Sequence, residues 1–153
     1  LFKDTSGADK VALSGFDFKG LFLVRGAEGG YFKWLKSNKG VYDGFLLSTA
    51  NCFGDILAEI LKSGGDANKQ SFLSSKLSEL AKTVFDICSE LPYGNVFTNA
   101  NKAVDHFMAY GKDAYTRKPP MLYSENRIPV EIIQKVGSIL SEYGLMPEKG
   151  YMY

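Results

Sequence analysis

The first seven residues, LFKDTSG, contain the side chain with the clearest chemical potential in this chain. Two apolar residues lead directly to Lys3, and small or polar residues follow it at once. This order is typical of a buried strand that ends at a site and then turns into a helix. A low dielectric at such a strand end favours the neutral amine, which can attack a carbonyl to form a Schiff base. On the local pattern alone, a solvated strand-end lysine is the commoner interpretation, because most lysines lie in water.

Strand and helix patterns alternate three times in the first 65 residues. Short apolar runs predict strands over 1–4, 21–26 and 41–48. Helices are predicted over 8–16 and 29–37, and from Phe53 to a stop at Gly64 and Gly65. Continuous apolar runs of this length favour a parallel sheet that is buried on both faces. The first part of the chain is therefore predicted to be an α/β structure of three β/α units.

The pattern becomes helical after residue 65. Asp66 is predicted to cap a long helix that ends before Pro92, and Thr98 to cap a second one. A long connection over 112–128 leads to Pro129, the expected first residue of the last helix. The chain thus divides into residues 1–65 and 66–153. Because a barrel of this type closes with eight strands, we interpret the three strands as the C-terminal part of a (β/α)8 TIM barrel, followed by a three-helix extension.

Composition excludes several classes of function. The 153 residues carry a formal net charge of +1, so nothing indicates a nucleic-acid partner or an acidic membrane. Two cysteines in apolar helical patterns favour free thiols in a reducing compartment over a disulfide. One histidine and the absence of CxxC spacing make a zinc site improbable. No apolar run reaches the ~18 residues that a membrane helix needs.

Three strand-end motifs, taken together, resemble a known family. LFKDTSG, VRGAE and DGFLLSTAN occur in the order and spacing of the last three strands of the dihydrodipicolinate synthase and N-acetylneuraminate lyase family. The FTNANKAVDHFMAYG helix, the RKPP connection and the final helix are similar to that family's C-terminal helices. The resemblance covers essentially the whole chain and implies a class I, pyruvate-dependent aldolase fold, in which the three strands are strands 6–8 of the barrel.

The resemblance also implies roles for individual residues. Lys3 matches the family lysine that forms a Schiff base with pyruvate or another 2-keto acid, so neither a metal nor a separate cofactor is expected. Gly26 corresponds to a glycine whose backbone lines the pocket, and Ser48 to a residue that contacts substrate. Glu28 lies near the position where sugar-acid lyases hold substrate hydroxyls. An acidic residue that meets a helix dipole is an equally good interpretation of Glu28.

The expected activity is a carbon–carbon lyase or aldolase that joins or separates pyruvate and an aldehyde. The substrate is expected to be a 2-keto-3-deoxy sugar acid or N-acetylneuraminate. Two alternatives remain open: dihydrodipicolinate synthase, which condenses pyruvate with aspartate semialdehyde, and an inactive half-barrel that serves assembly or ligand binding. The resemblance further implies a cytoplasmic protein and a homo-oligomer, often a tetramer built on barrel dimers.

Two departures from the family pattern bear on the site. Gly29 stands where an acidic pocket residue is usual, which affects the distal end of the substrate. The family's carboxylate-binding Gly-Thr-Thr/Ser loop and its proton-relaying tyrosine belong to the front half of the barrel, and neither pattern occurs here. We therefore expect the N-terminal half of the barrel to be a partner that activity requires.

Overall fold

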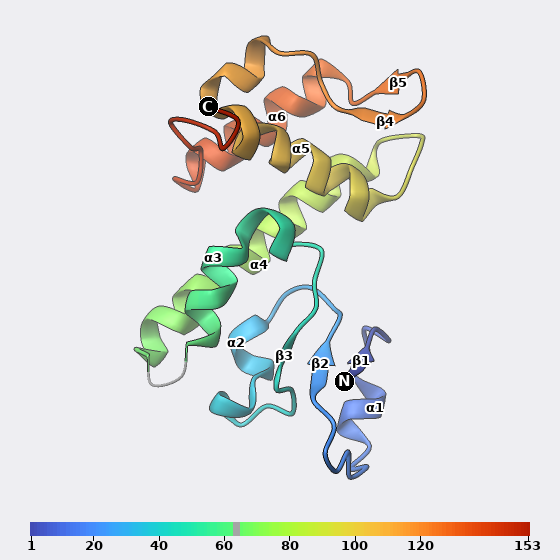
Figure 1. The fold of residues 1–153 in the computed structure, drawn as a ribbon, viewed down its shortest axis with the longest axis vertical. Helices are drawn as coiled ribbons and strands as arrows, with labels where there is room; N and C mark the ends of the chain where they lie inside the picture. The colour runs from blue at the N-terminus through green and yellow to red at the C-terminus, as the bar shows by residue number, and fades with distance from the viewer. Residues whose placement is uncertain (63–64) are drawn as a thin grey trace. The chain divides into compact units, whose positions relative to one another are not determined.

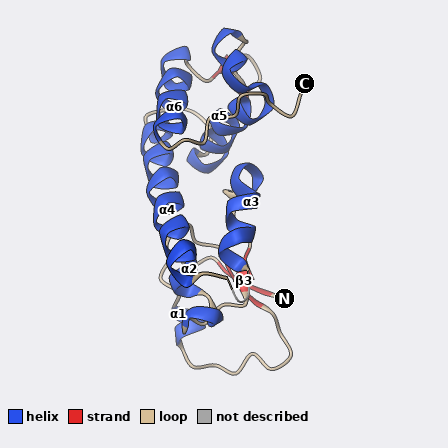
Figure 2. Ribbon diagram, turned by 90° about the vertical axis from the view of Figure 1, so that its left-hand side faces the viewer, coloured by secondary structure: helices blue, strands red, loops and turns tan. Residues whose placement is uncertain are grey.

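The computed structural model describes residues 1–62 and 65–153, and Gly64, an expected helix stop, lies outside them. It divides into two compact units, Leu1–Glu79 and Leu80–Tyr153. Figure 1 labels the elements, and Figure 2 separates helix from strand by colour. None of the described helices is both long enough and apolar enough to span a bilayer.

Unit 1 contains the predicted parallel sheet. Its strands are β1 (Phe2–Asp4), β2 (Leu23–Arg25) and β3 (Gly44–Phe45), in the order β1-β2-β3. All pairs are parallel, and Lys3 lies opposite Val24 in the register. The sequence therefore predicted all three strands and their direction, although each strand is shorter than its apolar run.

Short helices connect the strands of unit 1: α1 (Lys10–Leu13), α2 (Tyr31–Trp34) and the 3-10 turn η1 (Lys36–Asn38). The longer helix α3 (Ala50–Leu61) follows the last strand. The prediction of a helix over 8–16 was too long, because Asp9 and Gly15 both adopt positive φ and bound α1 on its two sides. α3 buries Phe53, Leu57 and Ile60, three members of the predicted apolar stripe.

Only one face of the sheet is covered by helices. Alternation along the strands places Leu23 and Arg25 on the face where α1 and α2 lie (Figure 2), and Ala12, Leu23 and Tyr42 pack there. The opposite face, which we call the open face, carries Leu1, Lys3, Phe22, Val24, Gly26, Gly44 and Leu46. Leu1, Phe22 and Leu46 are 71%, 56% and 52% exposed. The central strand β2 is buried on both faces as expected, since Leu23 and Val24 are 4% and 3% exposed, whereas the outer parts of the open face are not covered.

The long helix α4 (Ala67–Ser89) contributes to both units. Asp66 caps it as predicted, because its carboxylate accepts the backbone N–H groups of Asn68 and Lys69. In unit 1, the Ser74 hydroxyl accepts the N–H of Phe32 and the Ser78 hydroxyl accepts that of Gly30. These hydrogen bonds attach the first half of α4 to unit 1. The boundary between the two units, between Glu79 and Leu80, therefore lies inside α4 and not at residue 65.

Unit 2 contains α5 (Val96–Tyr110), the 3-10 helix η2 (Gly111–Thr116) and α6 (Val130–Glu142). An antiparallel hairpin, β4 (Met121–Tyr123) and β5 (Asn126–Arg127), lies within the predicted connection over 112–128. α6 follows Pro129 as expected, and Gly144 ends the segment with φ 67°.

The N-cap of α5 differs from the prediction. Asn95 has extended backbone angles, and its side chain accepts the N–H groups of Phe97 and Thr98 at 2.9 and 3.3 Å. Thr98 is therefore a first-turn residue and not the cap. Both residue types favour caps, so composition could not distinguish them.

Replacing Asn95 with Ala should lower the free energy of unfolding of unit 2 by about 1 kcal/mol, because two first-turn N–H groups lose their acceptor. The matched control is Thr98→Ala, which should change it by less than about 0.5 kcal/mol. Urea denaturation followed by circular dichroism measures both. Equal losses for the two variants would contradict the assignment of the cap.

Candidate active site

Lys3 and Gly26 form the first part of the site. Lys3 lies in β1, one residue before its end, and Gly26 directly follows β2. A Cβ built on Gly26 would lie 2.6 Å from Lys3 Cε, so the lysine stem passes directly over the glycine. Lys3 is exposed, and among the described residues no hydrogen bond or ion pair holds its Nζ. The glycine thus leaves room for an amine that is free to react.

Glu28 and Ser48 form the second part. The Glu28 carboxylate accepts the Tyr31 hydroxyl at 3.0 Å, the Ser48 hydroxyl at 3.0 Å and the Thr49 N–H at 3.1 Å. Thr49 is the N-cap of α3, so the carboxylate also meets the positive end of a helix dipole. Glu28 therefore connects the loop after β2 with the start of α3, and most of its acceptor capacity is already used.

The four predicted site residues thus form two pairs in the structure. All four lie at or after the carboxyl ends of the parallel strands, where sites of α/β folds collect: Lys3 in β1, Gly26 and Glu28 after β2, and Ser48 after β3. No hydrogen bond joins Lys3 or Gly26 to Glu28 or Ser48 within 1–62 and 65–153. Gly29 stands where the family usually has an acidic pocket residue. Its carbonyl oxygen accepts a hydrogen bond from the Arg25 guanidinium.

A buried polar network supports the strand ends on the helix-covered face. Arg25 Nε donates to Asp9 Oδ1 at 2.8 Å, and Arg25 Nη1 donates to the carbonyls of Ala27 and Gly29. The Tyr42 hydroxyl lies 2.6 Å from Asp9 Oδ1 and 3.2 Å from Asp4 Oδ2. Asp4 also accepts the N–H groups of Ser6 and Ala12, the latter in α1. These contacts tie β1, α1, β2 and the loop before β3 together.

The ionisation of this network follows from its contacts. Burial raises the pKa of Asp9, but the Arg25 and Tyr42 donors outweigh it, so the pKa lies below the ordinary 3.8. Burial also raises the pKa of Asp4, but the hydrogen bonds from Ser6, Ala12 and Tyr42 lower it by more, so the pKa of Asp4 lies below its ordinary value. Burial, together with the neighbouring carboxylates, raises the pKa of Tyr42. At neutral pH the network therefore holds two carboxylates, one guanidinium and a neutral phenol.

Sequence reasoning found part of this network and missed the rest. An arginine at the end of an apolar run, such as Arg25, needs a partner for its charge, and a carboxylate is the usual one. Asp9 was not identified, because a polar residue in a turn is unremarkable without knowledge of its burial. Asp9 is only 3% exposed, a value that tertiary packing decides.

A second group of chemically capable side chains lies in unit 2, and sequence reasoning did not assemble it. Lys102, Asp105 and His106 from α5, with Lys118 and Arg127, line a cavity of about 340 Å³. The one available signal was the basic RKPP segment, which was taken only as a connection. In the described part of the chain, no group of three or more His, Cys, Asp or Glu side chains is placed to hold a metal ion.

Comparisons with known proteins add nothing to this geometry, since no family model, curated protein or solved structure matches the chain. The assignment of a function therefore depends on the residues and their contacts.

The Asp9→Asn variant should lose about 3–5 kcal/mol of unfolding free energy in unit 1, because it leaves the Arg25 charge buried without its carboxylate. The control is Asp17→Asn. Asp17 pairs with Lys19 at the surface, where its side chain is 66% exposed, and a change below about 0.5 kcal/mol is expected. Equal effects would contradict a stabilising role for the buried pair.

The same pair should make unit 1 sensitive to acid. The pKa of Asp9 is lower in the folded state than in the unfolded state, where it lies near 3.8. Such a carboxyl stabilises the folded state at pH values above its unfolded-state pKa. That contribution is lost as the pH falls through the lower folded pKa. The difference in unfolding free energy between wild type and Asp9→Asn should therefore shrink on going from pH 7 to about pH 2. Urea titrations at several pH values measure it, and a constant difference would contradict the ionisation assigned to Asp9.

Proposed function

We propose that this chain supplies the Schiff-base lysine of a pyruvate-dependent aldolase or lyase, with Lys3 as the nucleophile. The observation that carries the proposal is the setting of Lys3. Its amine is unpaired among the described residues, its stem lies over Gly26, and it lies near the carboxyl end of a parallel strand on the open face.

The chemistry needs few groups from this half of the site. The neutral Lys3 amine attacks C2 of pyruvate, water leaves, and a protonated iminium forms. The iminium accepts the electron pair that remains at C3 when a C–C bond breaks or when C3 loses a proton. The nitrogen thereby takes the role that a metal ion has in other aldolases. Gly26 contributes by leaving space for the lysine stem and the keto acid beside it.

Glu28 bears on the choice of aldehyde. A sugar-acid lyase needs a carboxylate that is available to substrate hydroxyls, whereas Glu28 already accepts three donors, among them the Ser48 hydroxyl. This occupancy favours the condensation of pyruvate with aspartate semialdehyde over the cleavage of a 2-keto-3-deoxy sugar acid or N-acetylneuraminate. Both reactions start from the same Lys3 iminium, so the lysine assignment does not depend on this choice.

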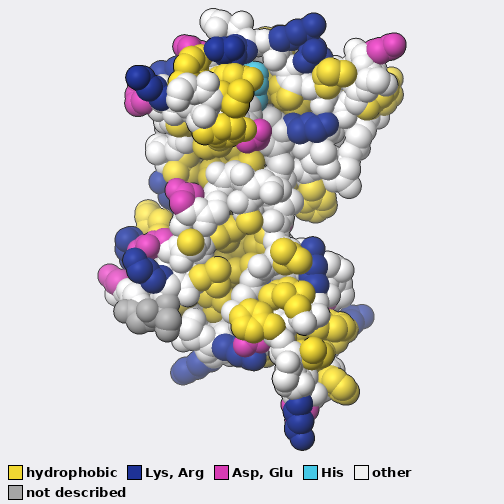
Figure 3. Space-filling view, in the orientation of Figure 1, with side chains coloured by type: hydrophobic (Ala, Val, Ile, Leu, Met, Phe, Trp, Pro, Cys, Tyr) yellow, Lys and Arg dark blue, Asp and Glu magenta, His cyan; other side chains and the backbone are white. Residues whose placement is uncertain are grey.

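The open face supports a partner for the sheet. Leu1, Phe22 and Leu46 are more than half exposed around Lys3, and Figure 3 shows hydrophobic side chains gathered over this part of unit 1. The N-terminal half of a barrel would cover this apolar surface and would supply the carboxylate-binding loop and the proton-relaying tyrosine. Such a complete barrel, homo-oligomeric and cytoplasmic, is the form in which we expect activity.

The second candidate is an inactive half-barrel that serves assembly or ligand binding. The same exposed apolar face favours it, because that face is suited to contact with another polypeptide even if Lys3 never reacts. The two functions differ in one observable property, which is covalent capture of a keto acid at Lys3.

Borohydride reduction in the presence of pyruvate tests the proposal, with the upstream half of a barrel supplied in the same chain or as a second polypeptide. Peptide mass spectrometry should find pyruvate, less water and plus two hydrogens, on Lys3. Lys3→Arg should abolish the adduct, because a guanidinium forms no Schiff base under these conditions. Lys10→Arg, at an exposed lysine of α1, is the matched control and should retain it. A folded, complete barrel that gives no adduct on Lys3 would leave the assembly function as the better one.

Gly26→Ala should slow the capture of pyruvate by about 100-fold, because the new methyl group would lie 2.6 Å from Lys3 Cε and must displace the lysine. Gly54→Ala is the control, since a Cβ there meets nothing within 4 Å, and its rate should equal that of wild type. The rate of adduct formation is measured by quenching the borohydride reaction at intervals. An unchanged rate for Gly26→Ala would show that the position of the stem does not matter.

A further inference from the structure

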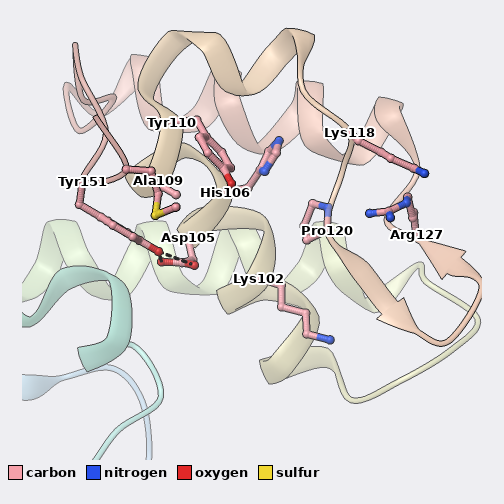
Figure 4. A pocket seen from close by; sticks show the side chains of 10 residues that line it. Lys102, Asp105, His106, Ala109, Tyr110, Lys118, Pro120, Arg127 and Tyr151 are labelled. Carbon is pink, nitrogen blue, oxygen red and sulfur yellow. Dashed lines mark hydrogen bonds between the residues drawn. The ribbon is translucent and has the colours of Figure 1, made fainter.

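A pocket in unit 2 is independent of Lys3 and of the proposed reaction. It has a volume of about 340 Å³, and Figure 4 shows side chains from three segments around it. One wall is α5, a second is the segment from Lys118 to Arg127, and the third is the C-terminal tail with Tyr151. Three separate segments thus enclose a space of the size that a small molecule occupies.

α5 turns one face toward this pocket. Lys102, Asp105, His106, Ala109 and Tyr110 recur at helical spacing along it. The tail is attached to the end of the same helix, because the N–H groups of Tyr151 and Met152 donate to the carbonyls of Met108 and Ala109. The Tyr151 hydroxyl contacts the Asp105 carboxylate at 2.9 Å (Figure 4). The tail wall is therefore held in place by both backbone and side chain.

The charges around the pocket do not balance. Lys102, Lys118 and Arg127 are cationic, whereas Asp105 is the one acidic residue that lines the described pocket. Within 1–62 and 65–153, none of the three cations forms an ion pair with a carboxylate. Lys102 donates to the carbonyls of Met121 and Leu122, and Arg127 to that of Pro119, so neutral acceptors alone orient them. Two positive charges in excess remain beside the cavity.

His106 adds a polar surface but no charge. It is buried, and Nε2 lies 3.0 Å from the Ala114 carbonyl, which can only accept, so Nε2 carries the proton. Burial lowers the pKa of His106, which keeps the ring neutral near pH 7. The excess charge of the pocket therefore comes from its lysine and arginine side chains.

The apolar part of the pocket lies beside the cationic part. Figure 4 shows Lys118 and Arg127 together at one side with Pro120 beside them, and His106 and then Tyr110 further along the pocket. The Arg117 guanidinium stacks on the Tyr110 ring at 4.3 Å and so fixes the orientation of that ring. A ligand that fits this arrangement carries an anionic group at one end and a flat or apolar body at the other.

We propose that this pocket binds a small organic phosphate monoester, with the phosphate against Lys118 and Arg127 and the organic body against Pro120 and Tyr110. A phosphate dianion matches the two excess positive charges, whereas a carboxylate would leave one of them uncompensated. The guanidinium and the ammonium donate to phosphate oxygens, as is usual at phosphate sites. The cavity volume limits the ligand to a small molecule.

Isothermal titration of the whole 153-residue chain with phenyl phosphate tests the proposal. Lys118→Gln and Arg127→Gln should each weaken binding at least about tenfold, the loss expected when one charged donor to the phosphate is removed. Lys112→Gln is the matched control, because Lys112 pairs with Glu148 and does not line the pocket, and its affinity should stay within about twofold of wild type. Circular dichroism spectra and melting curves that match wild type show that the variants are folded.

Three further measurements distinguish the proposal from its alternatives. Phenyl phosphate should shift amide resonances of α5, the 118–127 segment and the tail; shifts confined to other residues would overturn the proposal. Inorganic phosphate should bind more weakly than phenyl phosphate, and equal affinity would overturn the role of the organic body. Benzoate should also bind more weakly, and a tighter complex with benzoate would overturn the choice of phosphate over carboxylate.

Discussion

The Arg25 guanidinium lies at the centre of unit 1, and the strand ends depend on it. It pairs with Asp9 at 2.8 Å and donates to the carbonyls of Ala27 and Gly29. A buried guanidinium is costly unless its donors are satisfied, so these contacts hold the loop after β2 in one shape. That loop carries Gly26 beneath Lys3 on one side and Glu28 toward α3 on the other. The positions of Gly26 and Glu28 thus depend on one satisfied buried charge.

A second constraint comes from the two faces of the sheet. Helices and the Arg25 network cover one face, whereas the open face presents Lys3 among exposed apolar side chains. Exposed apolar surface is unfavourable in water, so a partner that covers the open face would stabilise the sheet. This is why we connect the proposed Schiff-base chemistry with a complete barrel.

The pocket of unit 2 is built from one face of α5, the 118–127 segment and the C-terminal tail. Gly150 permits the tail to approach α5, since a Cβ there would collide with the Ala109 backbone. Lys102 and Arg127 bond only to carbonyls, which orient them without neutralising their charge. A pocket of this kind retains an attraction for anions that ion-paired surface lysines, such as Lys112, have lost.

The sequence by itself determined the parallel strands of unit 1, the Asp66 cap and the last helix after Pro129, because apolar periodicity and turn chemistry are local signals. It also predicted a site at Lys3 and Gly26, which lie in contact in the structure, and at Glu28 and Ser48, which share a hydrogen bond; their role in a site stays a prediction. Only the tertiary structure decided that Asp9 pairs with Arg25, that one sheet face stays open, and that Lys118 and Arg127 share a cavity. Burial and pairing between residues far apart in the chain depend on how elements pack, and no local pattern encodes that packing.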